Sequence, residues 1–528
     1  MTLQISEPVN LLEEIIDTCS KEIKEEKDNI KQILLTIFSA WTNNPQNTRI
    51  LAPSGEGKTY LVTKLATLFP KENIIILAKA TPQSFKYALS AKVIENGTGI
   101  YQEYAEALKP LEEEFKKSKN NEEKEEIKQQ IRGLRDSACD LVDFTNKVII
   151  LVDSQSFELF ESLKSTLSHD QQEIKSFSVN KSRSGTIQGQ KFIIRGFPAV
   201  IYCSAKDEQQ KDTTDEINTR FNTISLNASP TKYRKMLELE ALHSSLPDSI
   251  YQEEVISEEE IEELKETITD VIQSVEEYGK CWNPFSMGLQ KLFSDDGGFR
   301  TRQFKILNNN ITVHTLVNAK QRSKIIHDGV TTPVATRLDI DQACKLTKES
   351  KEIQPYKIKY FNDYIRPAIL EIGNTKNVIE GEVKCLTARE IAEYITKKGR
   401  FTDRQRLQET ILRPLIDHGF LEEFEDPDNK RRNIYSITQN YQNKNAELES
   451  TLIDTSTLDD SCLSIFIEKY IEHRFESGNL KILDENGNEI IPKELLEILN
   501  QIDNQTPQIS HKNDSIDSLI DIDNEEDN

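Results

Sequence analysis

The sequence predicts an α/β protein in which a parallel sheet carries helices on both faces, followed by a helical region and a smaller helix-and-strand unit. Two observations predict this fold class. Short apolar runs at 74–77, 148–152 and 199–203, and a strand-like run at 48–51, have the length of buried strands. Helical patterns separate these runs, and strands that alternate with helices usually pair in parallel. The 528 residues are enough for about three or four domains.

Composition and charge exclude several classes of protein. No apolar run approaches the roughly 18 residues that a bilayer crossing needs, and the first residues lack the basic and apolar regions of a signal peptide. The 7 cysteines show no C-x-x-C spacing, which argues against a disulfide framework or a zinc site and favours a reducing cytoplasm. The net charge of −23 means that nucleic acid, if bound, must contact local basic patches.

Composition also suggests where the chain divides. Residues 9–42 have helical apolar spacing, and the Glu- and Lys-rich segment 101–134 predicts an inserted helical hairpin, with a solvated disordered loop as the alternative. The pattern from 232 to 350 is wholly helical. The region after 440 is polar, with one helix near 459–473, and the acidic stretch from Asp514 predicts a disordered tail. The predicted units are 1–45, 46–231, 232–350, 351–440 and 441–528.

The strongest motif is Ala-Pro-Ser-Gly-Glu-Gly-Lys-Thr at 52–59, which fits a P-loop with alanine in place of the first glycine. It follows a predicted strand and precedes an amphipathic helix, which is the context that the motif requires. The glycines let backbone N–H groups surround phosphates, the lysine reaches the β- and γ-phosphates, and the threonine ligates Mg²⁺. We therefore expect ATP and Mg²⁺ as cofactors. The predicted nucleotide-binding residues are Gly55, Glu56, Gly57, Lys58, Thr59 and Tyr60.

The run 147–153 has the form of a Walker B strand. Asp153 at its carboxyl end is expected to hold Mg²⁺ near Thr59. A P-loop ATPase usually has a water-activating glutamate at the next position, where this chain has Ser154. Either the base comes from elsewhere or hydrolysis is slow. The candidate bases are Glu158, Glu161 and Asp170.

Two further residues are candidates for contact with the γ-phosphate. The run 199–205 ends in small polar residues, and Ser204 is the predicted sensor 1, with an ordinary strand end as the alternative. Arg220 follows an acidic helix start and precedes another apolar strand. It is expected to enter the ATP site of a neighbouring subunit, with a surface arginine in a turn as the alternative.

This order of motifs resembles the AAA+ ATPases of the clade with a pre-sensor 1 hairpin, to which the replicative minichromosome maintenance helicases belong. Superfamily 3 viral helicases and plasmid or phage primase-helicases are similar. The hairpin is expected at 174–181 and 186–195, and its bases, without any acid, are Lys175, Lys181, Arg183, Lys191 and Arg195. In the family such hairpins line the channel of a hexamer and grip single-stranded DNA. The resemblance therefore implies a homo-hexamer with DNA contacts at Lys181, Arg183 and Lys191.

The resemblance extends from about residue 45 to 350. The stretch 299–304 resembles the sensor 2 region of the helicase lid, where Arg302 matches the arginine that approaches the γ-phosphate. The stretch 334–341 resembles the end of the same lid.

Residues 384–437 have the pattern of a winged helix. Helices are expected at 386–395 and 404–417, and strands at 420–424 and 434–437, joined by a basic turn. The predicted contacts with duplex DNA are Arg404, Arg406, Lys430, Arg431 and Arg432. Winged helices also bind proteins, which is the alternative here. The minichromosome maintenance helicases carry a similar unit after the ATPase.

The sequence thus favours a cytoplasmic, ring-forming DNA helicase or translocase that acts in replication, with an acidic tail that binds another replication protein. One alternative is an ATP-switched DNA-binding protein, of the origin-recognition or regulatory kind, with little hydrolysis. The other is a scaffold whose ATP site is a relic.

Overall fold

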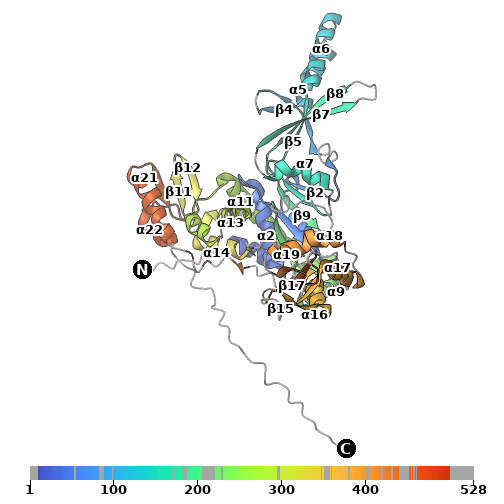
Figure 1. Cartoon of the computed structure of the whole chain (residues 1–528). Coiled ribbons are helices and arrows are strands. Elements are labelled where there is room, and N and C mark those ends of the chain that lie inside the picture. Colours follow the sequence, from blue (N-terminus) through green and yellow to red (C-terminus); the bar gives the residue numbers. More distant parts are fainter. Residues whose placement is uncertain are drawn as a thin grey trace, which may run out of the picture.

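The structure of the chain is a computed structural model (Figure 1). It describes residues 10–52, 55–82, 89–97, 99–153, 155, 157–168, 171–181, 187–204, 220–226, 230–293, 298–346, 348–349, 357, 360–378, 381–398, 403–417, 420–429, 432–438, 451–452, 455, 458 and 461–499. Several predicted residues lie outside this part of the chain: Ser154, Asp170, Arg183, Lys430, Arg431 and the tail from Asp514. The side chains of Lys181 and Arg406 are also outside the description.

The central sheet contains the predicted strands, and all its strands are parallel. Its strands are β1 (Asn47–Leu51), β2 (Ile74–Leu77), β6 (Val148–Leu151), β9 (Ala199–Ser204) and β10 (Asn222–Ser225). The order is β10-β1-β9-β6-β2, so β9 lies between the strand that precedes the P-loop and the strand that precedes Asp153. The predicted α/β class with a parallel sheet is therefore confirmed, and the arrangement is compatible with an AAA+ core.

Helices cover both faces of this sheet because its central strands alternate two sets of buried side chains. Ile50, Ile150 and Ile201 face a core formed with α1 (Leu11–Ser20), α2 (Lys27–Phe38) and α3 (Lys58–Ala66). Ile149 and Tyr202 face α7 (Phe157–Ser168) on the other side. The N-terminal segment, predicted as continuous helical spacing, is divided into α1 and α2 by a turn at 21–26.

A second sheet, which the sequence did not predict, stands beside the first. Its order is β4-β3-β5-β8-β7. The strands are β3 (Ala91–Glu95), β4 (Tyr101–Glu103), β5 (Cys139–Asp143), β7 (Glu173–Lys181) and β8 (Ile187–Arg195). The structure has two helices where the sequence predicts a helical hairpin, α5 (Tyr104–Lys117) and α6 (Asn121–Ser137), and they project from this sheet (Figure 1). The strands β7 and β8 thus pair antiparallel within the same sheet from which α5 and α6 project.

The region after the central sheet mixes helices with strands. Its helices are α9 (Pro230–Ser245), α10 (Asp248–Val255), α11 (Glu258–Tyr278), α12 (Ser286–Leu289), α13 (Gly298–Val317) and α14 (Arg337–Leu346). The wholly helical pattern predicted for 232–350 is wrong at β11 (Lys324–His327) and β12 (Val330–Pro333). Each strand has four residues, too few to show a period of two, and β11 also pairs with the distant β19 (Leu480–Leu483).

The C-terminal helices pack into one apolar core with α13 and α14. α20 (Ser461–Phe466) continues through a π-helical stretch, Ile467–Glu472, into α21 (His473–Glu476), close to the helix predicted at 459–473. α22 (Pro492–Leu499) follows β19, and Leu463, Ile482 and Leu495 are buried with residues of α13 and α14. Figure 1 shows α21 and α22 beside β11 and β12.

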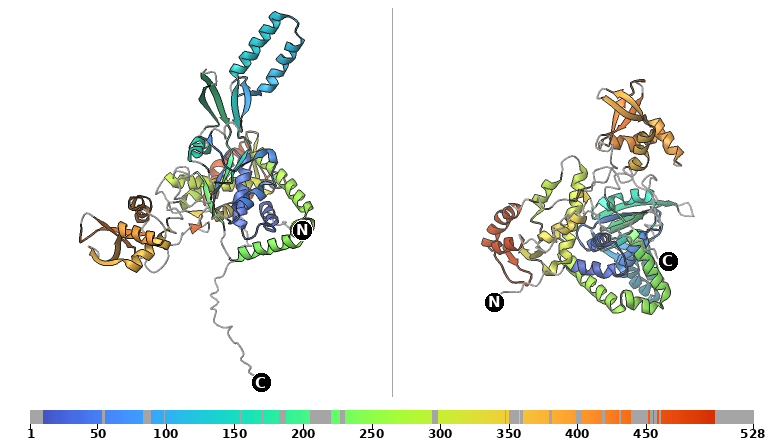
Figure 2. Two further views of the ribbon diagram at one scale, coloured as in Figure 1. Left: turned by 90° about the vertical axis from the view of Figure 1, so that its right-hand side faces the viewer. Right: turned by 90° about the horizontal axis from the view of Figure 1, so that it is seen from below.

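Residues 360–437 build a unit with its own apolar core, coloured orange in Figure 2. It contains a π-helical stretch, Phe361–Ile365, followed by α16 (Arg366–Ile372), α17 (Ala388–Lys397), α18 (Arg404–Leu407), a second π-helical stretch, Gln408–Leu412, and α19 (Arg413–Asp417). The strands β14 (Asn374–Val378), β15 (Gly381–Thr387), β16 (Leu421–Glu425) and β17 (Asn433–Ile437) form a sheet in the order β14-β15-β17-β16. A capping box between Thr387 and Glu390 starts α17. None of the described helices is long and apolar enough to cross a bilayer.

Candidate nucleotide-binding site

The loop between β1 and α3 has the backbone that a phosphate-binding loop requires. Gly55 has a φ of +92° and Gly57 a φ of +85°, which favours glycine at both positions. No atom of the described residues lies within 4 Å of a Cβ added at either glycine, so the backbone angle, rather than lack of space, requires glycine. Gly57 is the N-cap of α3, whose first N–H groups therefore face the loop.

Lys58 is the first residue of α3, directly after this loop. Lys58 is only 8% exposed, and its Nζ donates a hydrogen bond to the Ala52 carbonyl oxygen at 2.5 Å. Burial lowers the pKa of Lys58 from its usual value. The ammonium group thus lies against a backbone carbonyl at the start of the loop, where phosphate oxygens are expected to compete for it.

The strand order brings the other predicted residues to the same edge of the sheet. Leu51 of β1 pairs with Ser204 of β9, and Asp153 follows the carboxyl end of β6. Burial raises the pKa of the Cys203 thiol to about 12, with a lowering influence from Lys58 and a raising one from Asp153. Both charges therefore lie near the Cys203 sulfur.

The hydroxyl oxygen of Ser204 is buried at this edge of the sheet, in a position where it could contact a ligand. The residue is 0% exposed, and its Oγ has no hydrogen-bond partner among the described residues. Buried hydroxyls are normally hydrogen-bonded, so an unsatisfied one at this edge fits a contact with phosphate or water.

The described residues do not supply an obvious catalytic base. Glu158 and Glu161 are exposed on α7, and no described contact joins either to the P-loop. The sequence analysis missed Gln155, whose buried amide donates to the carbonyl oxygens of Ala78 at 2.9 Å and Asp153 at 2.7 Å. Gln155 thereby holds the backbone that follows β6.

The sequence analysis also missed a contact between α9 and the P-loop. The Tyr233 hydroxyl lies 2.9 and 3.0 Å from the two carboxylate oxygens of Glu56. Lys232 Nζ donates to Glu26 Oε1 at 2.6 Å and lies 3.4 Å from the Glu56 carbonyl oxygen. The hydroxyl of Tyr60, which is predicted to bind nucleotide, donates to Glu22 at 3.0 Å. The 21–26 turn, the P-loop and α9 therefore converge.

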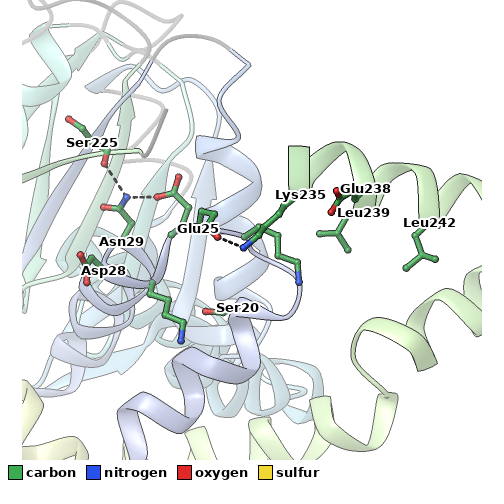
Figure 3. Close-up of a pocket in the computed structure, with 12 residues that line it drawn as sticks. Ser20, Glu25, Asp28, Asn29, Ser225, Lys235, Glu238, Leu239 and Leu242 are labelled. Carbon is green, nitrogen blue, oxygen red and sulfur yellow. Dashed lines mark hydrogen bonds and ion pairs between the residues drawn. The ribbon is translucent and has the colours of Figure 1, made fainter. Parts of the chain in front are cut away.

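A cavity of about 880 Å³ lies between the 21–26 turn and α9 (Figure 3). Lys235 of α9 pairs with Glu25, and Asn29 donates to the Ser225 carbonyl oxygen at 3.0 Å. Ser225 ends β10 at the same edge of the sheet as the P-loop, because it pairs with Leu51. The cavity therefore reaches the carboxyl edge of the sheet at Ser225, and it is lined mainly by polar and charged side chains.

The two predicted arginines lie away from the chain's own P-loop. Arg220 precedes β10, at the amino edge of the sheet, and donates to the Lys164 carbonyl oxygen of α7. Arg302 is exposed on α13, whose described contacts are with α1, α2, α11 and α14. Because parallel strands place the P-loop at the opposite edge, Arg220 does not reach the P-loop of its own chain.

A magnesium site of the P-loop type needs few protein ligands. The described residues contain no group of three or more His, Cys, Asp and Glu side chains that could hold a metal ion. A nucleotide-bound Mg²⁺ takes most of its ligands from phosphates and water, and the protein groups here that could contact it are the hydroxyl of Thr59 and the carboxylate of Asp153.

The basic hairpin is less positive than its own sequence indicates. Glu95 of β3 accepts from both Lys175 and Lys191, and Lys175 also lies 3.2 Å from Glu173. The net charge of residues 174–195 does not include Glu95, because this carboxylate comes from a different strand.

In the second predicted DNA-binding unit, Arg404 is exposed. The Arg432 side chain is 56% exposed and lies 3.9 Å from the buried Asp426 carboxylate. Lys376 of β14 also pairs with Asp426, at 2.5 Å, so this carboxylate lies near two basic side chains.

Comparisons with known proteins add little to this geometry. No family model and no curated protein matches the chain. Among solved structures it is similar to one described as Drosophila ORC bound to DNA, with 10% identity over 81% of this chain and 96% of that one, at a TM-score of 0.21. A TM-score this low does not establish a shared fold.

Proposed function

We propose that the chain is an AAA+ ATPase that acts on DNA as a ring-forming helicase or translocase in replication. The observation that carries the proposal is the position of β9 between β1 and β6. It gathers the P-loop, Asp153 and Ser204 at one edge of the sheet. The β7–β8 hairpin directly precedes β9, so a DNA contact on the hairpin has a short path to the ATP site.

In this proposal, the loop N–H groups and Lys58 bind the phosphates of ATP, and Ser204 contacts the γ-phosphate or the attacking water. Thr59 and Asp153 would hold Mg²⁺, which supplies charge neutralisation when bound. The unsatisfied Ser204 hydroxyl and the two positive-φ glycines support this assignment.

The rest of the proposal concerns DNA and assembly. Arg220, and Arg302 with it, would complete the ATP site of a neighbour in a homo-hexamer. The hairpin would grip single-stranded DNA in the ring channel, and residues 351–440 would act as a winged helix on duplex DNA. The acidic C-terminal stretch would bind another replication protein, in the cytoplasm.

A second function is favoured by a specific observation. No glutamate follows Asp153, and Gln155 is engaged with backbone groups. A protein with this site would bind ATP, turn it over slowly and act as a nucleotide-switched DNA-binding protein.

Size measurement with and without Mg²⁺-ATP separates the two functions. The motor requires a hexamer that forms with ATP and fails to form in Lys58→Ala. ATP binding by a monomer or dimer favours the switch. Absence of ATP binding by the unaltered protein would contradict both.

A further inference from the structure

We propose that Lys232 is a positioning residue that fixes the Glu56–Gly57 peptide of the P-loop in its phosphate-binding orientation. The inference rests on the proposed ATP-binding function. Lys232 is 3% exposed, although it is a lysine on a helix whose other residues are mostly exposed. Its Nζ lies 2.6 Å from Glu26 Oε1 and 3.4 Å from the Glu56 carbonyl oxygen.

The geometry of the peptide bond links this contact to phosphate binding. In a planar trans peptide, the C=O of one residue and the N–H of the next point in opposite directions. When Lys232 attracts the Glu56 carbonyl outward, the Gly57 N–H is turned to the other side, toward the inside of the loop. N–H groups at the start of a helix are the donors that bind phosphate.

The loop itself does not hold this peptide firmly. Gly55 and Gly57 flank Glu56, both have positive φ, and neither has a side chain to restrict rotation. Contacts from outside the loop therefore decide the orientation. Tyr233 supplies a second one by binding the Glu56 carboxylate, which keeps that negative charge turned toward α9.

Glu26 explains why a lysine is tolerated in this buried position. The side chains of Lys232 and Glu26 are 4% and 3% exposed, so each charge depends on the other for compensation. The pair joins α9 to the 21–26 turn and holds the ammonium group over the P-loop backbone.

The test is the affinity for Mg²⁺-ATP measured by calorimetry on the full chain, with Lys235→Met as the matched control. Lys235 lies one turn further along α9 and pairs with Glu25, but its side chain is 46% exposed. We expect Lys232→Met to weaken ATP binding about tenfold or more, since one lost charge-assisted interaction has about that effect. Lys235→Met should stay within about twofold of the unaltered protein.

A double variant covers the case in which Lys232→Met does not fold. Glu26→Gln combined with Lys232→Met removes both charges and leaves neither uncompensated, so it should melt near the unaltered protein. Weak ATP binding by this folded variant, with Lys232→Arg recovering part of the affinity, supports the proposal. Unchanged affinity in the double variant overturns it. If the unaltered protein itself binds no ATP, the proposed function fails instead.

Discussion

Replacing Gly57 with alanine tests whether the backbone of the P-loop is held in its phosphate-binding form. Gly57 has a φ of +85°, and a Cβ added there meets no atom within 4 Å. The change is therefore purely conformational and costs about 1–2 kcal/mol. If the loop keeps its φ, the cost is lost stability; if the loop relaxes, the cost is lost ATP affinity, about tenfold for 1.4 kcal/mol.

Gly133 provides the matched control, because it too has open space but lies inside the helix α6. Gly133→Ala should stabilise the protein by about 0.5–1 kcal/mol and leave ATP binding unchanged. The assay combines thermal melting without nucleotide and calorimetric titration with Mg²⁺-ATP. A Gly57→Ala protein as stable as the unaltered one, and with the same affinity for ATP, would refute the reasoning.

Three further outcomes are expected. Ser204→Ala should leave nucleotide-free stability unchanged or about 1 kcal/mol higher, because its hydroxyl has no described partner, and should lower ATP turnover about tenfold; equal turnover would argue against the sensor role. Glu95→Gln should release its two lysines, so that single-stranded DNA binds more tightly in anisotropy titrations and with a steeper salt dependence; an unchanged slope would argue against DNA on the hairpin. Burial lowers the pKa of His314, while Arg322 and His314 hold the pKa of the buried Asp339 below its usual range despite burial. Both groups bind protons more readily in the unfolded chain, so melting experiments should show stability falling as the pH drops below about 6.5. Each group contributes up to about 1.4 kcal/mol per pH unit, and Asp339 contributes only below about pH 4. A flat stability profile from about pH 7 to 5 would rule out a neutral buried histidine.

Local sequence patterns predicted those parts of the fold that consist of continuous signals. The strands at 74–77 and 148–152 are uninterrupted apolar runs, and the P-loop is defined by neighbouring residues. The order of the strands places Ser204 beside the P-loop strand.

Pairings between distant segments were not predictable in this way. β11 pairs with β19 across more than 150 residues, and each strand is only four residues long. Glu95 neutralises bases on a hairpin about 80 residues further along the chain. The contact of Lys232 with Glu56 depends on how α9 leaves the sheet, which no residue pattern near position 232 indicates.

ATP turnover by the purified protein, with and without single-stranded DNA and beside Lys58→Ala, tests the central proposal most directly. We predict that ATP turnover rises strongly with DNA and is lost in Lys58→Ala, whose site lacks the buried ammonium group. ATP binding with negligible turnover under both conditions would contradict the motor and leave the nucleotide-switched DNA-binding protein.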